Sequence, residues 1–253
     1  MTKKRQFEIK LTNQILASFV VLLSLGLGYF IAKEQGWLKK VSPDSLTAQR
    51  NYIQGEYLID INPYSSLPIE KIISSRRTRR QFQTTSISKN DLSKLTWSLQ
   101  GVTADWGGRV APTIKSSYPL EVSIIIRSVE DMESGIYHYI PKDRIIKKTH
   151  SEIPEYFNIL GEKSPSLKDA PVIFLISGNQ SKVSSVLDTD ETHHFLYLEA
   201  GHATQNLFLM AESLGLGVNP ITHFNQSLIQ SSISLPLEES PIYILPVGYP
   251  QEI

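Results

Sequence analysis

Four arginines crowd into five positions in the stretch Arg76-Arg77-Thr78-Arg79-Arg80. In an extended segment alternate side chains share a side, so Arg76, Thr78 and Arg80 would project together. Two guanidinium groups and a hydroxyl at one spot can bind an anion, because arginine forks match phosphate oxygens and stay charged. The stretch by itself also allows a solvated run of charge, with Arg77 and Arg79 directed into solvent or into salt bridges.

The rest of the composition argues against a general nucleic-acid binder. The chain has 253 residues, and its 25 Lys and Arg are balanced by 25 Asp and Glu, whereas such a binder carries a broad basic surface. It contains no cysteine, which excludes disulfides, zinc–thiolate sites, iron–sulfur clusters and cysteine nucleophiles. We therefore expect no nucleic-acid partner.

The N-terminal end forms a separate basic module. Residues 1–40 hold seven Lys and Arg against two Asp and Glu, which gives +5 and leaves −5 on the remainder. Residues 11–32 carry no charge, and a bilayer core about 30 Å thick needs roughly 20 apolar helical residues. These patterns predict a basic tail over 1–13, a single-pass transmembrane anchor over 14–32, a linker over 33–66 and one domain over 67–253. A cleaved signal peptide and a buried helix are the alternatives, and basic residues on both flanks leave the side of the membrane open.

Apolar periodicity places helices and strands in alternation along the domain. Helices are expected at 67–75, at 88–101 with Ser88 as the N-cap, and at 191–217. Strands are expected at 119–128, 135–140 as an edge strand or hairpin arm, 170–178 and 240–248, with a short strand at 57–61 in the linker. Strands in mixed order with flanking helices predict an α+β domain with a central mixed or antiparallel sheet.

A second set of polar residues lies on the helix expected at 191–217. Glu199, His202 and Asn206 are spaced i, i+3 and i+7 with Gln205 beside them, so they form one stripe. Glu-x-x-His is a known pair of metal ligands, but a two-metal site needs two such pairs and the chain has one. We therefore assign no metal. The stripe either lines a site or forms a hydrogen-bonded polar network without chemistry.

Six segments, in order, resemble the nitroreductase superfamily, and most closely its SagB-type dehydrogenase branch, which includes azoline and thiazole oxidases. They are RRTRRQF, LSKLTWSLQGVT, APTIKSSYPLEV, GIYHY, LEAGHATQNLFLMAESLGLG and IYILPVGYP, and together they cover essentially the whole region after the linker. The resemblance implies the nitroreductase-like fold, an FMN cofactor and a homodimer that binds it between subunits. The implied reaction is hydride transfer through flavin N5 to or from a small molecule, with NAD(P)H as a candidate donor.

The resemblance also implies roles for single residues. Arg76 and Arg80 would hold the FMN phosphate, and Thr78 would hydrogen-bond the flavin or the ribityl chain. Thr113 would lie in a segment that passes close to the cofactor. Lys115 stands in that segment where the family has a glycine, and would either clash with the flavin or add a cation near its pyrimidine or phosphate.

Further cofactor contacts are implied beyond these, while the catalytic residues stay unassigned. Thr222 would offer its backbone N–H to flavin N5, and His223 stands where glycine is usual. The dimer core near the flavin would include the polar stripe, Glu199, His202, Gln205 and Asn206. The Lys-Tyr pair associated with azoline oxidation is absent from SSVLDTDETHHF, which disfavours that reaction. The departures at Lys115 and His223 leave an alternative, a flavin-free binding or scaffolding module tethered to the membrane.

Overall fold

The centre of the domain is an antiparallel sheet. The computed structural model describes residues 50, 52–53, 56–58, 67–188 and 191–251, all within one compact unit that spans Ser42–Ile253. In that part of the chain the sheet has seven strands in the order β1-β4-β3-β2-β5-β7-β6, and every strand pairing is antiparallel. The strands are β1 (Glu56–Leu58), β2 (Leu120–Ile126), β3 (Gly135–Ile140), β4 (Ile145–His150), β5 (Val172–Asn179), β6 (Gly217–Val218) and β7 (Glu239–Gly248).

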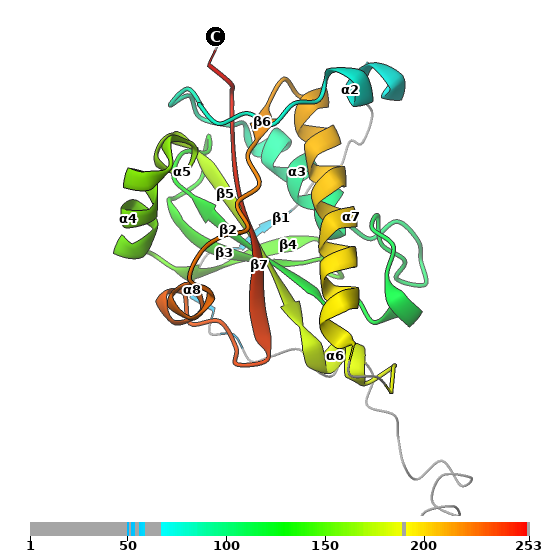
Figure 1. Cartoon of the computed structure of the whole chain (residues 1–253). Coiled ribbons are helices and arrows are strands. Elements are labelled where there is room, and N and C mark those ends of the chain that lie inside the picture. The colour runs from blue at the N-terminus through cyan, green and yellow to red at the C-terminus, as the bar shows by residue number, and fades with distance from the viewer. Residues whose placement is uncertain (1–49, 51, 54–55, 59–66, 189–190, 252–253) are drawn as a thin grey trace, which may run out of the picture. The chain divides into compact units, whose positions relative to one another are not determined.

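Helices cover both faces of this sheet and give a layered α+β domain (Figure 1). One face carries α3 (Lys89–Gln100), α6 (Gln180–Ser184) and the long α7 (Thr192–Ser213), with α2 (Ile69–Ser75) beside the C-terminal end of α7. The other face carries α4 (Glu155–Lys163), α5 (Pro165–Asp169) and α8 (Gln226–Ser232).

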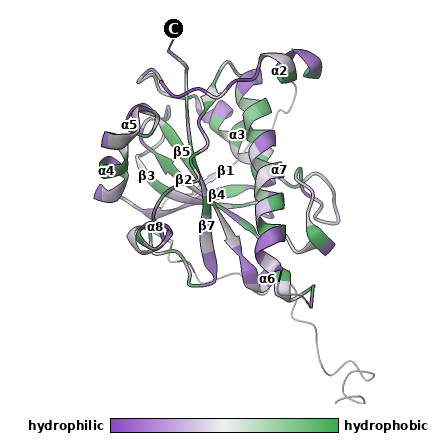
Figure 2. Ribbon diagram, in the orientation of Figure 1, coloured by the Kyte–Doolittle hydropathy of each residue, from purple (hydrophilic) through white to green (hydrophobic). Residues whose placement is uncertain are grey.

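Strand β5 shows how the sequence builds two cores. Val172, Phe174 and Ile176 join the apolar cluster under α3 and α7, whereas Ile173 and Leu175 join the cluster under α4, α5 and α8. Successive side chains of a strand point to opposite faces, so a strand covered on both sides is apolar throughout. In Figure 2, where green marks hydrophobic residues, β5 is largely green.

Helix α3 confirms the expected capping. Ser88 Oγ accepts a hydrogen bond from the backbone N–H of Asp91 at 3.0 Å, which satisfies one of the free donors at the helix start. Gly101 ends the helix and donates its N–H to the carbonyl of Trp97 at 2.7 Å. The predicted apolar face is buried and packs on the sheet.

Strand β3 was expected as an edge strand or hairpin arm, and it is a hairpin arm inside the sheet. Its partner β4 was not predicted, because the sequence IIKKTH places two lysines in a short strand. Lys148 is nevertheless buried: its ammonium pairs with Glu133 Oε2 at 2.7 Å and lies 5.8 Å from the centroid of the Tyr137 ring. Half-exposed strands are recognised by alternating apolar and polar residues, and a buried lysine interrupts that pattern.

Part of the predicted linker packs on the domain. Strand β1 pairs with β4, and the Tyr57 ring meets the Tyr137 ring edge to face with centroids 5.7 Å apart. Arg50 forms an ion pair with Glu239 of β7. The short strand predicted at 57–61 is therefore found at Glu56–Leu58, where it covers the otherwise open edge of β4.

The predicted transmembrane span, residues 14–32, lies outside the described residues. Across residues 50–251, apart from the gaps given above, no helix is both long enough and apolar enough to cross a bilayer.

Candidate functional site

The arginine cluster runs in an extended segment beside the edge strand β6. Arg76 ends α2, and its backbone N–H donates to the carbonyl of Ile72 at 3.0 Å. Thr78 forms a parallel bridge with Val218, and the N–H of Arg79 donates to the Val218 carbonyl at 3.1 Å. The extended conformation that the alternation argument requires is thus present at the centre of the cluster.

No carboxylate in the described part of the chain neutralises the positive charge of this segment. Arg76 lies over the ring of Phe208 on α7, with 5.2 Å from its guanidinium carbon to the ring centroid. Arg77 turns back and donates to the carbonyls of Ser74 and Arg76, and Arg80 is exposed. No carboxylate among the described residues pairs with any of these arginines. Unpaired guanidinium groups are available to an anionic ligand.

The loop after β6 returns to the same edge of the sheet. Ile221 exchanges two backbone hydrogen bonds with Ile244 of β7, at 2.9 and 3.0 Å. Thr222 and His223 follow directly and are exposed. Thr78 is anchored to Val218 of β6, and Ile221 to Ile244 of β7, so both segments lie along the same edge of the sheet.

Glu199 holds the turn that contains Thr113 and Lys115. Its Oε1 accepts from the backbone N–H of Ile114 at 2.8 Å and from Thr113 Oγ1 at 3.1 Å. Glu199 is buried, with only 5% of its surface exposed. Burial raises the pKa of this carboxyl, while the two hydrogen bonds and the charge of Arg109 act in the opposite direction.

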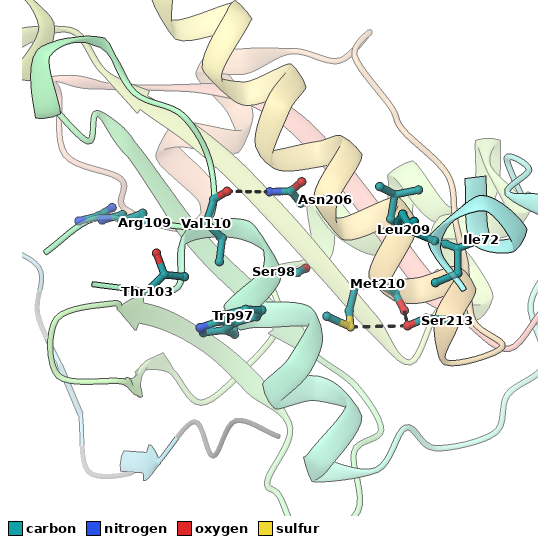
Figure 3. A pocket seen from close by; sticks show the side chains of 11 residues that line it. Ile72, Trp97, Ser98, Thr103, Arg109, Val110, Asn206, Leu209, Met210 and Ser213 are labelled. Atoms are coloured by element: carbon teal, nitrogen blue, oxygen red, sulfur yellow. Dashed lines mark hydrogen bonds between the residues drawn. The ribbon is translucent and has the colours of Figure 1, made fainter. Parts of the chain in front are cut away.

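The polar stripe on α7 divides between the interior and the surface. Seven residues after Glu199, Asn206 donates from Nδ2 to the carbonyl of Val110 at 3.3 Å (Figure 3). Helix α7 thus holds the Val110–Ile114 segment at two points. His202 and Gln205 are exposed and take no part in these bonds.

The predicted cofactor residues fall into two groups within one chain. The arginine segment contacts α7 at Phe208, whereas the Thr113 turn contacts α7 at Glu199. Nine residues separate these contacts, which is about 14 Å along a helix axis. Within a single chain the two groups therefore contact α7 at separate places.

A cavity of about 490 Å³ lies between α2, α3 and α7 (Figure 3). Six of its eleven lining residues are apolar, namely Ile69, Ile72, Trp97, Val110, Leu209 and Met210, and the other five are Ser98, Thr103, Arg109, Asn206 and Ser213. Arg109 is the cationic residue of this lining, and its side chain is held by two contacts. Its Nη1 donates to Gln100 Oε1 at 2.9 Å, and its guanidinium carbon lies 4.5 Å from the Tyr118 ring centroid.

Sequence reasoning missed this cavity. Its walls come from three helices and a loop, and no local spacing signals that they meet. Its α2 wall leads directly into the arginine segment, because cavity-lining Ile72 accepts the hydrogen bond that Arg76 donates.

A second concentration of titratable groups is buried away from this cavity. Glu121 pairs with Lys182 at 2.6 Å and with His138 at 3.4 Å, and Arg50 pairs with Glu239. Burial lowers the pKa of His138 to about 3 and raises that of Glu239 to about 7. All five side chains are nearly inaccessible to solvent, so this network joins parts of the fold and does not contact a dissolved substrate.

Comparison with known proteins identifies the fold and the family. A chain from Anabaena variabilis superposes with a TM-score of 0.67 at 22% identity, over 78% of this chain and 42% of that one. A chain from Ralstonia eutropha gives 0.68 at 19% identity, over 81% and 95%. Both crystal structures are titled as nitroreductases, and this chain spans less than half of the Anabaena protein.

Sequence comparison extends the assignment beyond the fold. A Methanocaldococcus jannaschii protein that carries a nitroreductase name is 28% identical over 191 residues, which is 75% of this chain and 95% of that protein. The sequence profile of the Nitroreductase family matches residues 73–249, well over half of the chain. The chain therefore belongs to the nitroreductase family and is an oxidoreductase of that family.

Proposed function

We propose that this chain is an FMN-dependent oxidoreductase in which the arginine segment holds the FMN phosphate. The supporting observation is a set of guanidinium groups that no described carboxylate neutralises, on an extended segment fixed to β6. Arg76 and Arg80 pair with phosphate oxygens in this proposal, and Thr78 adds a hydroxyl. The residues present fit the group, since guanidinium groups without a carboxylate partner among the described residues can pair with a dianionic phosphate.

When bound, FMN supplies hydride transfer at its N5 atom, and the protein supplies binding, orientation and electrostatics. In this proposal the backbone N–H of Thr222, at the same sheet edge, would donate a hydrogen bond to flavin N5. NAD(P)H is the proposed electron donor, because members of the nitroreductase family generally use it. The other reactant is an unidentified small molecule.

We assign that small molecule to the cavity between α2, α3 and α7. The cavity adjoins the arginine segment through Ile72, and its volume of about 490 Å³ suits a small organic ligand. Six of its eleven lining residues are apolar, and the polar ones include Arg109 and Asn206. An uncharged or anionic ring compound fits such a lining better than a cation does.

A homodimer is proposed to complete the cofactor site. The arginine segment and the Thr113 turn contact α7 about 14 Å apart along its axis. In a dimer with two-fold symmetry, the turn of one chain can stand against the arginine segment of the other. The arginine segment and the Thr113 turn of one chain would then bind two different FMN molecules.

A single membrane anchor at residues 14–32 is part of the proposal, since this run is uncharged and long enough to span. The side of the membrane decides the donor. On the cytoplasmic side NAD(P)H is at hand, whereas on the outer side a quinone or another membrane electron carrier takes its place. Peptide azoline oxidation of the SagB type is not proposed, because the Lys-Tyr pair is absent from the segment before α7.

A direct test compares FMN with riboflavin, which lacks the phosphate. The full chain is purified in a mild detergent and titrated with each flavin while flavin fluorescence is recorded. We expect FMN to bind at least tenfold more tightly than riboflavin, since charge-assisted hydrogen bonds contribute about 1.5–3 kcal/mol each. Equal affinities would refute the phosphate role of the arginines. No binding of either flavin would favour the alternative of a flavin-free scaffolding module.

A further inference from the structure

Helix α2 carries large apolar side chains on its exposed surface. Ile69 and Ile73 are 51% and 58% exposed, and because they are four residues apart they lie on one face of the helix. Leu67, two residues before the helix, is 42% exposed. Ile69 also lines the cavity, so this apolar surface forms part of the cavity rim. An exposed cluster of large apolar side chains marks a surface that binds a partner or a membrane.

Positive charge accompanies these apolar side chains. Residues 67–80 hold five Lys and Arg and one Glu, which gives a net charge of +4. Lys71 and Arg77 are exposed, and no carboxylate among the described residues forms an ion pair with either. Arg77 donates to the backbone carbonyls of Ser74 and Arg76, which keeps its charge beside α2. Lys71 and Arg77 are not assigned to the FMN phosphate, so their charge remains for another anionic partner.

An anionic bilayer matches both properties of this surface. Apolar side chains enter the boundary between the headgroups and the acyl chains, and Lys and Arg residues attract anionic headgroups. A nucleic acid would engage the cations and leave Ile69 and Ile73 in water. A second copy that paired α2 with α2 about a two-fold axis would bring Lys71 and Arg77 against the same cations. The proposed anchor at residues 14–32 would hold the domain beside such a bilayer.

We infer that the exposed surface of α2 docks on an anionic bilayer and forms a second membrane contact besides the proposed anchor. This membrane-contact surface comprises Leu67, Ile69, Lys71, Ile73 and Arg77. The inference uses none of the residues assigned to FMN, and it rests on the proposed anchor only for the delivery of the domain to the membrane. Docking turns the cavity rim toward the lipid, since Ile69 belongs to both the rim and the membrane-contact surface.

Single cysteines can probe this contact, because the chain contains no cysteine of its own. Ile73→Cys places an environment-sensitive fluorophore on the membrane-contact surface. The matched control is Leu237→Cys, since Leu237 is 91% exposed in the loop between α8 and β7, at the opposite end of the domain from α2 (Figure 1). The full chain is reconstituted into nanodiscs that contain one third phosphatidylglycerol, with and without lipids that carry a nitroxide quencher high in the acyl chain.

We expect the nitroxide to quench the Ile73→Cys label about threefold more strongly than the Leu237→Cys label, because only the first enters the lipid. Replacing both Lys71 and Arg77 by Gln should reduce the ratio of docked to undocked chains by about tenfold, since each cation near an anionic surface contributes to binding. Nanodiscs of phosphatidylcholine alone, or high salt, should reduce the quenching in the same way.

Equal quenching of the two labels would overturn the inference and leave the FMN function intact, because flavin binding is measured separately in the same nanodiscs. Quenching that needs neither phosphatidylglycerol nor the two cations would also overturn it. A blue-shifted Ile73→Cys label in detergent, without nitroxide quenching in nanodiscs, would show instead that a second copy covers this surface. A chain that does not associate with nanodiscs at all would overturn both the proposed anchor and the membrane-contact surface.

Discussion

The guanidinium of Arg50 forms an ion pair with the carboxylate of Glu239, 189 residues further along the chain, with both side chains nearly inaccessible to solvent. Glu239 also accepts the hydroxyl hydrogen bond of Ser177 at 2.8 Å. This pair fastens the segment before β1 to the last strand of the sheet. Arg50 and strand β1, which lie in the predicted linker, therefore both contact the domain.

The ion pair gives a prediction for stability. Arg50→Ala leaves Glu239 buried without its partner and should reduce the free energy of unfolding by about 3–5 kcal/mol. Urea unfolding at pH 8 measures this, with exposed Lys142→Ala as a control that should stay within about 0.5 kcal/mol. Adding Glu239→Gln to Arg50→Ala should recover part of the loss, because the uncompensated charge is gone. An Arg50→Ala loss below about 1 kcal/mol would contradict a buried pair.

Glu239 and His138 predict opposing effects of pH on stability. Burial raises the pKa of Glu239 from 4.5 to about 7, so the folded state holds its proton more tightly and stability falls as pH rises between these values. Burial lowers the pKa of His138 from 6.5 to about 3, so its contribution to stability rises with pH between 3 and 6.5. In the wild type the two slopes offset one another between pH 4.5 and 6.5.

Glu239→Gln should expose the histidine slope. The unfolding free energy of this variant, relative to the wild type, should increase by about 1.4 kcal/mol per pH unit between pH 4.5 and 7. Urea unfolding at several pH values measures the difference. Parallel curves for the variant and the wild type would show that Glu239 is ionised throughout this range.

The Glu199 clamp predicts a large loss on truncation. Glu199→Ala leaves the Ile114 N–H and the Thr113 hydroxyl without their acceptor and removes the support of their turn. We expect about 2–4 kcal/mol less stability, from two lost bonds to a charged group. Glu212→Ala on the same helix is the control and should change little. Hydrogen exchange at residues 113–118 should speed up in Glu199→Ala alone, and unchanged protection there would refute the clamp.

The proposed substrate cavity predicts a change in KM without a change in cofactor binding. Ser213 is a small residue that lines the cavity, and Ser213→Phe would fill part of it. We expect KM for a ring-compound acceptor to rise at least fivefold, while the Kd for FMN stays within twofold. Exposed Ser231→Phe on α8 is the matched control. Equal KM values in both variants would place the substrate elsewhere.

Structural features that depend on neighbouring residues could be predicted from the sequence, whereas those that depend on distant residues could not. Helix α3 was predicted with its cap, because Ser88, Asp91 and Gly101 are local signals that the structure keeps. Strand β4 was missed because the burial of Lys148 depends on Glu133, which lies 15 residues away. Arg50 could not be placed either, since its partner is at the far end of the chain.

The candidate site also has features that depend on neighbouring residues and features that depend on distant ones. Arg76, Thr78 and Arg80 share one face only on the assumption of an extended segment, and the bridge at Thr78 agrees with that assumption. The positive φ of Lys115 was not predicted, although a glycine in the family at this position is compatible with it. The cavity was not predicted either, since its walls meet only after packing.

The visible absorbance of the purified full chain tests the central claim most directly. The account predicts a bound-flavin spectrum for the wild type, release of FMN on denaturation, and loss of the spectrum in the Arg76→Ala/Arg80→Ala double variant with its fold intact. A folded wild-type protein that stays colourless after addition of FMN would contradict the account. So would a double variant that retains FMN as tightly as the wild type.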